Sequence, residues 1–363
     1  MTDTGARAQL WVGTYPQPGA EPGSGESIWR VELDRADGSV ASAVPAVAAT
    51  SPSFLAAHPS GRSLYAVGET AAGTLTAFRV GDADGTATLA PSGSVASGGD
   101  DPCHVLARGD VVWLANYGDG VAAAVPVDAA TGDLAADGVV AHPGVGSGPV
   151  VERQAGPHAH FVAEAGDDVL VCDLGADVVR RYPATGADAG APADVAAVLP
   201  PGTGPRHLVT LADGSLVVVG ELDARAHLLV RDGEGWTPAA AVPVSPAAEG
   251  GRDFPAHVTL SADGTRVHVG VRGADLLAVL AVRPADGGAP VLEHLADVPL
   301  GDGAWPRHHA VLAAGADDAA ETVVVALQGR SELATVRIDP ATGAGEVVAR
   351  HALPTPPACV LES

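Results

Sequence analysis

Short apolar runs separated by turn residues recur along the whole chain, and they predict β-strands. The clearest example is residues 202–226, "GTGPRHLVTLADGSLVVVGELDARA", where an Asp-Gly turn separates two apolar runs. An Asp-Gly pair between apolar runs is typical of a β-hairpin. The amphipathic periodicity of helical repeats is not found along the chain. We therefore expect many short strands and turns in place of long helices.

This hairpin is one copy of a repeat of about fifty residues. A proline, or a histidine in one copy, marks the start of each copy. The marks are Pro52, Pro102, His158, Pro205, Pro255, Pro306 and Pro357, at steps of 50, 56, 47, 50, 51 and 51 residues. A copy contains four strand signals. A period near fifty with four strands per unit is typical of a β-propeller blade.

The last copy is cut short by the C-terminus, and the N-terminus supplies what it lacks. The segment "PPACVLES" provides a first strand, while "AQLWVGTY", "ESIWRVEL" and "GSVASAVP" provide a second, third and fourth strand. We therefore expect an all-β, seven-bladed β-propeller with four antiparallel strands per blade. Its ring is closed by N- and C-terminal strands that share one blade. No linker is found, so residues 1–363 are expected to form a single domain.

Composition narrows the range of functions. The twenty basic residues are all arginine, which excludes a Schiff-base lysine and a P-loop lysine. A net charge of −24 argues against nucleic acid and anionic membranes as partners. An anionic ligand would need a local cluster of Arg and His.

Apolar segments and cysteines indicate the compartment. No apolar run approaches the ~20 residues of a membrane span, and the first residues lack the apolar region of a secretory signal. Cys103, Cys172 and Cys359 have no CxxC spacing, which argues against a disulfide framework or a zinc site. We expect buried cysteines in a cytoplasmic protein that needs no metal or cofactor.

The hairpin geometry gathers polar residues at one end of the strands. In a propeller the first strand of a blade lines the channel and the second runs back beside it. Arg206 and Glu221 are therefore expected to meet at the channel mouth. The pairs predicted in this way are Ser53 with Glu69, His104 with Asn116, His160 with Asp173, Arg206 and His207 with Glu221, His257 with Arg272, Arg307 and His308 with Gln328, and Cys359 with Thr14 and Tyr15.

Residues that recur in the repeat are more readily interpreted as structural than residues that break it. Histidines recur near the first position, as at 104, 158, 160, 207, 257, 308 and 309. His104, His207 and His308 are interpreted as hydrogen-bonding residues that connect blades. Arg206, Glu221 and Arg272 break the repeat and are better functional candidates.

Five segments, taken in order, resemble the lactonase family of seven-bladed propellers. They are "SPSFLAAHPSGRSLYAVGE", "PCHVLARGDVVWLANYGDG", "GPHAHFVAEAGDDVLVCDLGAD", "GPRHLVTLADGSLVVVGEL" and "VRGADLLAVLAV". The family includes propeller-type 6-phosphogluconolactonases and a fungal carboxymuconate cycloisomerase. Its proposed channel residues carry over onto His160, Arg206, Glu221 and Arg272. The chain departs from the family at Val271, where Asn is frequent, and in the third and sixth copies, which lack the usual "PDG" turn.

The resemblance implies a lactonase, a hydrolase of carbohydrate metabolism that opens a sugar lactone such as 6-phosphogluconolactone in the pentose phosphate pathway. His160 is the expected general base, and Glu221 either orients it or is itself the base. Arg206 and Arg272 are expected to bind the developing oxyanion, or a phosphate or carboxylate of an anionic lactone. The expected substrate-binding residues are His104, Asn116, His158, His257, Arg307 and Gln328.

Two alternatives remain open from the sequence. A carboxymuconate-type cycloisomerase would use the same two arginines to hold carboxylates while a lactone ring closes. A propeller that binds a ligand or protein without catalysis is equally compatible with the fold, because propellers host unrelated functions. The oligomeric state is left open.

Overall fold

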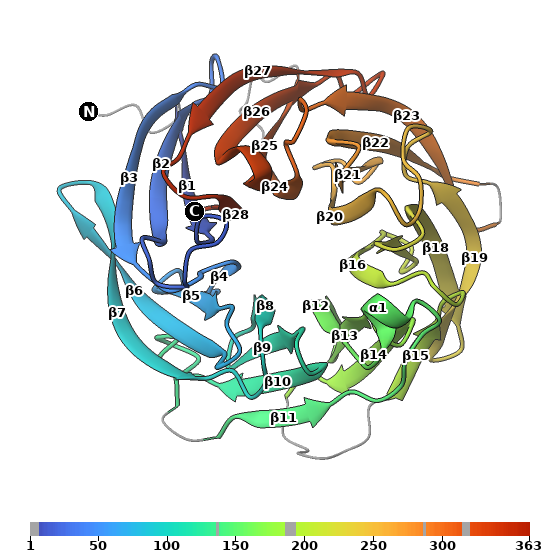
Figure 1. Cartoon of the computed structure of the whole chain (residues 1–363), viewed down its shortest axis with the longest axis horizontal. Helices are drawn as coiled ribbons and strands as arrows, with labels where there is room; N and C mark the ends of the chain where they lie inside the picture. The colour runs from blue at the N-terminus through green and yellow to red at the C-terminus, as the bar shows by residue number, and fades with distance from the viewer. Residues whose placement is uncertain (1–6, 136–137, 186–193, 286–287, 314–319) are drawn as a thin grey trace. The chain divides into compact units, whose positions relative to one another are not determined.

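The computed structural model describes residues 7–135, 138–185, 194–285, 288–313 and 320–363. Within this part of the chain the strands form seven sheets of four strands each, as the repeat predicts (Figure 1). In the six sheets built from consecutive strands, all neighbouring strands pair antiparallel. In the seventh sheet, strands from the two chain ends lie side by side. The prediction that the terminal strands share one sheet is confirmed.

The chain divides into two compact units. The first comprises the described residues up to Val12, together with Arg30–Val44 and Pro205–Ser363, and the second comprises Gly13–Trp29 and Pro45–Gly204. That residues 1–363 form a single domain stays a prediction.

Three complete sheets belong to the first unit. Their strands are β16 (Pro205–Thr210), β17 (Leu216–Gly220), β18 (Arg225–Asp232) and β19 (Gly235–Pro243); β20 (Phe254–Leu260), β21 (Arg266–Arg272), β22 (Leu276–Arg283) and β23 (Val291–Pro299); β24 (Pro306–Val311), β25 (Glu321–Leu327), β26 (Glu332–Ile338) and β27 (Gly345–Ala352). The short 3₁₀ helix η1 (Gln328–Arg330) follows β25. The sheet of the chain ends runs in the order β28 (Pro357–Glu362), β1 (Arg7–Thr14), β2 (Ser27–Asp34) and β3 (Val40–Ala48).

Three further sheets belong to the second unit. Their strands are β4 (Leu55–Ala57), β5 (Ser63–Gly68), β6 (Thr74–Ala83) and β7 (Thr86–Ala96); β8 (Pro102–Ala107), β9 (Val111–Asn116), β10 (Val121–Pro126) and β11 (Val140–Pro143); β12 (Ala159–Ala165), β13 (Asp168–Asp173), β14 (Val178–Pro183) and β15 (Asp194–Val198). The helix α1 (Val151–Gln154) precedes β12. Among the described residues no helix has the length and apolar character needed to cross a membrane.

Burial explains why the second strand of a sheet has the most continuous apolar sequence. All five residues of β17, "LVVVG", are buried, whereas β19 in the same sheet is mostly exposed. A strand covered on both faces is apolar throughout, because every side chain meets a neighbouring sheet. In the first unit, Val217 and Val219 of β17 join Val267 and Val269 of β21 in one apolar cluster.

The second unit is packed in the same way, and it also contains two of the three cysteines. Tyr65 of β5 and Leu114 of β9 belong to one apolar cluster there. Cys103, Cys172 and Cys359 are all buried and not disulfide-bonded, as expected from their spacing.

The predicted Asp-Gly turns close two hairpins of the first unit. In the β20–β21 turn, Gly264 N–H donates to Ser261 O over 2.9 Å, and Gly264 has a φ of +69° that favours glycine. The Asp263 carboxylate accepts from Thr265 N–H, Thr265 Oγ1 and Ser261 Oγ at 3.0, 2.7 and 2.7 Å. The turn therefore depends on an ionised side chain as well as on glycine.

Asp263→Ala is expected to lower the free energy of unfolding at neutral pH by about 1 kcal/mol, because these hydrogen bonds are lost. Burial raises the pKa of Asp263, but hydrogen bonds from Ser261 and Thr265 and the charge of Arg266 outweigh it and hold the pKa well below its usual range. A carboxyl with a lowered folded-state pKa contributes stability above its unfolded pKa, near 3.9, and loses that stability as pH falls further.

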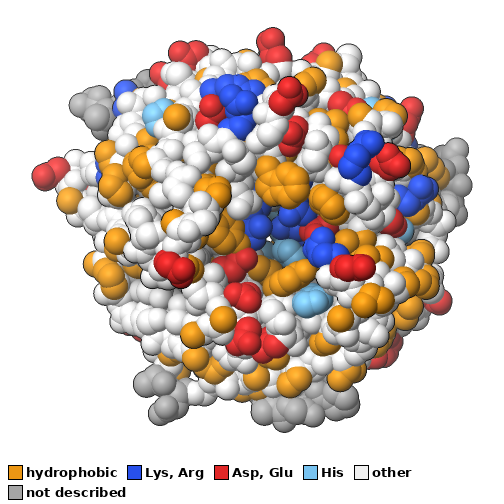
Figure 2. All heavy atoms as spheres, viewed as in Figure 1, with side chains coloured by type: hydrophobic (Ala, Val, Ile, Leu, Met, Phe, Trp, Pro, Cys, Tyr) orange, Lys and Arg blue, Asp and Glu red, His pale blue; other side chains and the backbone are white. Residues whose placement is uncertain are grey.

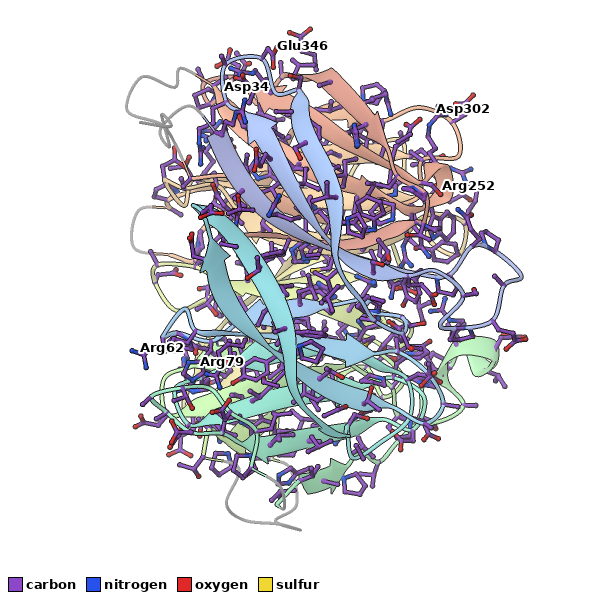
Figure 3. All side chains as sticks on the ribbon, turned by 90° about the vertical axis from the view of Figure 1, so that its left-hand side faces the viewer. Asp34, Arg62, Arg79, Arg252, Asp302 and Glu346 are labelled. Carbon is purple, nitrogen blue, oxygen red and sulfur yellow. The ribbon has the colours of Figure 1, made fainter. Side chains whose placement is uncertain are left out.

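Denaturant unfolding at several pH values measures this effect. The difference between wild type and Asp263→Ala should shrink from pH 7 to pH 3. Asp302→Ala is the control, because Asp302 is exposed in a loop (Figure 3) and its removal should change little at either pH. A difference that stays constant with pH would contradict the assignment.

Candidate active site

A β-bulge in the first strand of a sheet displaces the candidate residues from regular pairing. In β16, Pro205 pairs with Gly220 and His207 with Val219, so that Arg206 has no partner position in β17. The same irregularity recurs in other first strands. The residues skipped by the pairing are Cys103 in β8, His160 in β12, Arg206 in β16, Ala256 and His257 in β20, and Arg307 in β24. Because a bulge re-aims a side chain, these residues leave the alternation of the strand.

Arg206 lies inside β16, at the bulge. The hairpin still brings it to Glu221, which follows β17. Arg206 Nε lies 2.9 Å from Glu221 Oε2, and Arg272 Nη2 donates to the same oxygen over 2.6 Å. The three residues predicted from the first unit therefore form one cluster.

This cluster is buried, unlike many charged residues of the chain. Figure 3 shows Arg252, Asp302 and Glu346 projecting from loops and strand ends. By contrast, Arg206, Glu221 and Arg272 are only 2%, 3% and 7% exposed.

The cluster contains two guanidinium groups and one carboxylate, which leaves one positive charge in excess. Burying a charge is costly unless it is paired, so the cluster favours an anion. Figure 2 shows acidic side chains spread over the visible face of the protein.

Besides Glu221, Arg272 contacts a backbone carbonyl and an aromatic ring. Its Nε donates to Phe254 O over 3.2 Å, and its guanidinium carbon lies 5.5 Å from the centre of the Trp305 ring. That separation is within the range of a cation–π interaction. Trp305 has a φ of +47°, which is rare for a large side chain, and its N–H donates to Asp275 Oδ1 over 2.8 Å.

Sequence reasoning missed Trp305. The sequence feature that could have identified Trp305 is its position directly before the repeat marker Pro306. The residues directly before Pro52, Pro102 and Pro205 are Ser51, Asp101 and Gly204, which are smaller and share the positive φ.

Aromatic rings at or next to the first strands contact one another. In the second unit, the His104 ring centre lies 4.2 Å from those of Phe54 and Phe161, and His104 Nδ1 accepts from Val162 N–H over 3.2 Å. These contacts favour the structural interpretation of His104, which is also among the predicted substrate-binding residues. We call this arrangement the ring ladder.

The first unit has a ring ladder made of histidines. His257 stacks on His308 with ring centres 3.9 Å apart, and His207 meets His257 edge-on at 5.0 Å. His308 Nδ1 accepts from Val360 N–H over 3.2 Å, as His104 does from Val162. The predicted substrate-binding residue His257 therefore lies in the middle of the ladder.

His160, the predicted base, lies in the second unit. Its Nδ1 is 3.7 Å from Cys103 Sγ, and its ring meets Tyr117 edge-on with centres 5.5 Å apart. His158 stacks on Tyr117 with ring centres 4.5 Å apart, and its Nδ1 donates to Tyr117 O over 2.6 Å. Tyr117, which sequence reasoning missed, connects the two histidines.

The residues predicted to face these histidines have other contacts. Asp173 accepts from His158 N–H at 2.8 Å and pairs with Arg180 at 2.6 Å. Asn116 donates to Val121 O over 3.0 Å, and among the described residues its Oδ1 is buried without a hydrogen-bond partner. The contacts of Asp173 and Asn116 therefore favour a structural role for both side chains in their own sheets.

The remaining predicted residues belong to the first unit. Arg307 is half-buried on the bulge of β24, and Gln328 begins η1. Gln328 Oε1 is buried and lacks a hydrogen-bond partner within the described part of the chain. In that same part no group of three or more His, Cys, Asp or Glu residues is arranged to hold a metal ion. That the protein needs no cofactor stays a prediction.

Comparisons with known proteins identify the family of this chain. The profile of the family described as "Lactonase, 7-bladed beta-propeller" matches residues 9–361. A search of curated proteins finds no significant match.

Two solved structures are similar over almost their whole length. The periplasmic gluconolactonase PpgL of Pseudomonas aeruginosa is 29% identical, with a TM-score of 0.81 over 98% of this chain and 99% of that chain. A Bacteroides fragilis protein provisionally described as a 6-phosphogluconolactonase is 23% identical, with a TM-score of 0.82 over 100% and 99%. The predicted fold is confirmed: the seven sheets are propeller blades, and the chain belongs to the lactonase family of seven-bladed β-propellers.

Proposed function

We propose that this protein hydrolyses the ester bond of an anionic sugar lactone of the 6-phosphogluconolactone type. The observation that carries the proposal is the binding of two buried guanidinium groups by one carboxylate, Glu221, which leaves one positive charge in excess. The similar Pseudomonas protein is described as a gluconolactonase, which supports a sugar lactone as the substrate class.

The two arginines have different parts in this proposal. Attack of water on a lactone carbonyl builds negative charge on the carbonyl oxygen, and fixed guanidinium donors stabilise that charge. The side chain of Arg272 is 9% exposed and that of Arg206 only 2%. We assign Arg272 to the first contact with the anionic group and Arg206 to the more deeply buried end of the cluster.

The contacts of Glu221 favour an orienting role over the role of base. Both guanidinium groups stabilise its ionised form, and a carboxylate held ionised by two cations is a weak proton acceptor. Glu221 sets the spacing of the two arginines. His160 then remains the expected base, an assignment that rests on the family resemblance. The expected cytoplasmic location also stays a prediction, since the Pseudomonas protein is described as periplasmic.

Substrate selectivity tests the proposal. Purified protein should hydrolyse 6-phosphogluconolactone with a higher kcat/KM than glucono-δ-lactone. Arg272→Ala should lower kcat/KM for the phosphorylated lactone by about ten- to a hundredfold, because a charge-assisted hydrogen bond is lost. It should affect the neutral lactone much less. Arg272→Lys is the matched control that keeps the charge. Its kcat/KM for the phosphorylated lactone should lie between those of wild type and Arg272→Ala.

Three outcomes count against the proposal. Hydrolysis no faster than the buffer background over a panel of lactones would exclude lactonase activity. Equal losses for both lactones in Arg272→Ala would contradict the anionic substrate. Spectroscopic loss of a carboxymuconate, with no lactone hydrolysis, would point to the cycloisomerase alternative.

His160→Ala is expected to lower kcat by about 10²–10⁴ with little change in KM, because a general base acts on the chemical step. His160→Gln, which keeps the size of the side chain, should lose as much kcat. Circular dichroism and thermal melting check that both variants fold. A folded His160→Ala variant with wild-type kcat would remove His160 from the mechanism.

Glu221→Gln should destabilise the protein by about 3–5 kcal/mol, because two buried guanidinium groups lose the carboxylate that they share. Added sulfate should restore more stability to Glu221→Gln than to wild type, since an anion replaces the missing charge. The control is Glu249→Gln, which removes an exposed ion pair with Arg252 and should leave stability nearly unchanged. Equal effects of the two substitutions in denaturant unfolding would contradict the buried charge balance.

A further inference from the structure

The ring ladder of the first unit departs from its usual pattern at His207. At His104 and His308, the ring Nδ1 accepts a backbone N–H from the next first strand, in both cases over 3.2 Å. The Nδ1 atom of His207 instead lies 2.8 Å from Nδ1 of His257. Its Nε2 lies 3.2 Å from Nη1 of Arg206. Both nitrogens of His207 are therefore directed to side chains.

Chemistry determines which nitrogen of His207 carries the proton. A guanidinium group can only donate, so Nε2 of His207 must be the unprotonated acceptor. A neutral imidazole with a bare Nε2 carries its proton on Nδ1, from which it donates to His257 Nδ1. His257 then carries its own proton on Nε2. The two hydrogen bonds run in one direction, from Arg206 through His207 to His257.

The surroundings keep His207 neutral. The residue is 2% exposed, and the buried cluster next to it already has an excess of positive charge. A protonated His207 would direct an N–H at the Arg206 guanidinium and add a second cation beside it. Both effects are unfavourable in a buried site.

Two contacts determine the orientation of the planar Arg206 guanidinium group. Glu221 forms an ion pair with Arg206 at Nε, and His207 accepts a hydrogen bond from its Nη1. Because the guanidinium is planar and its donors have a fixed geometry, these two contacts also set the direction of its remaining nitrogen. Small errors in the position of a charged donor are costly in catalysis.

We propose that His207 is a positioning residue of the lactonase site, an inference that rests on the proposed function. In its neutral Nδ1–H form, oriented by His257, it fixes the Arg206 guanidinium for binding negative charge. This role separates His207 from His104 and His308, which connect neighbouring strands through backbone N–H groups.

His207→Phe tests the proposal, because phenylalanine already occupies the ladder at Phe54 and Phe161 and keeps the ring while removing the acceptor. It should lower kcat/KM about ten- to a hundredfold, mainly through kcat, with a nearly unchanged melting temperature. His207→Gln places an amide oxygen where it can accept from Arg206, and should restore kcat/KM to within about threefold of wild type. The control is His308→Phe, which alters the same ladder away from Arg206 and should keep wild-type kinetics.

The double variant with Arg206→Ala provides a readout that a packing role would not produce. If His207 acts through Arg206, His207→Phe should cost nothing further in that background. The proposal is overturned if the two losses multiply, if His308→Phe loses as much as His207→Phe, or if folded His207→Phe keeps wild-type kinetics.

A second measurement separates this proposal from the proposed function. If wild-type protein hydrolyses no lactone, the proposed function fails, and sulfate binding is measured by calorimetry on the same variants. His207→Phe should then weaken sulfate binding about three- to tenfold when Arg206 is present and not when it is alanine. Equal sulfate affinity of wild type and His207→Phe would overturn the positioning role by itself.

Discussion

One carboxylate, Glu221, binds two buried guanidinium groups, and the candidate site depends on these contacts. It accepts a hydrogen bond from Arg272 and forms an ion pair with Arg206. Buried charges need partners, and here the number of cations exceeds the number of anions by one. Glu221 holds Arg206 and Arg272 close together against their mutual repulsion. In the proposed function, the positive charge that remains among these three side chains binds the anionic group of the lactone. In that proposal, the stability of the protein and its affinity for an anion have the same physical origin.

The β-bulge in the first strands directs neighbouring side chains to different surroundings. Arg206 lies on the bulge and faces Glu221, while His207, the next residue, returns to regular pairing and joins the ring ladder. The same division separates His160 from Phe161 in the second unit. Adjacent residues thus serve the site and the scaffold, which a strict alternation of strand side chains does not allow. At His207 the two roles meet, because its ring belongs to the ladder and its Nε2 accepts from Arg206.

Much of the fold could be predicted because it depends on local patterns. The markers from Pro52 to Pro357 gave the period, and the Asp-Gly turns at 213–214 and 263–264 gave hairpins that the structure confirms. The broken last copy predicted the shared sheet of β28 and β1. The contact of Arg206 with Glu221 was also predictable, because antiparallel pairing across one short hairpin determines which residues meet.

The sequence by itself determined the strand pattern, the repeat and the candidate residues, since each is expressed in hydrophobic periodicity, turn chemistry and local hairpin pairing. Tertiary structure alone decided that Arg272 shares an oxygen of Glu221, that Trp305 covers Arg272, and that His207 accepts from Arg206. Glu221 and Arg272 come from different sheets, and their distance depends on how those sheets pack. The bulge matters equally, because one extra residue re-aims a side chain without leaving a mark in the alternation of apolar and polar residues.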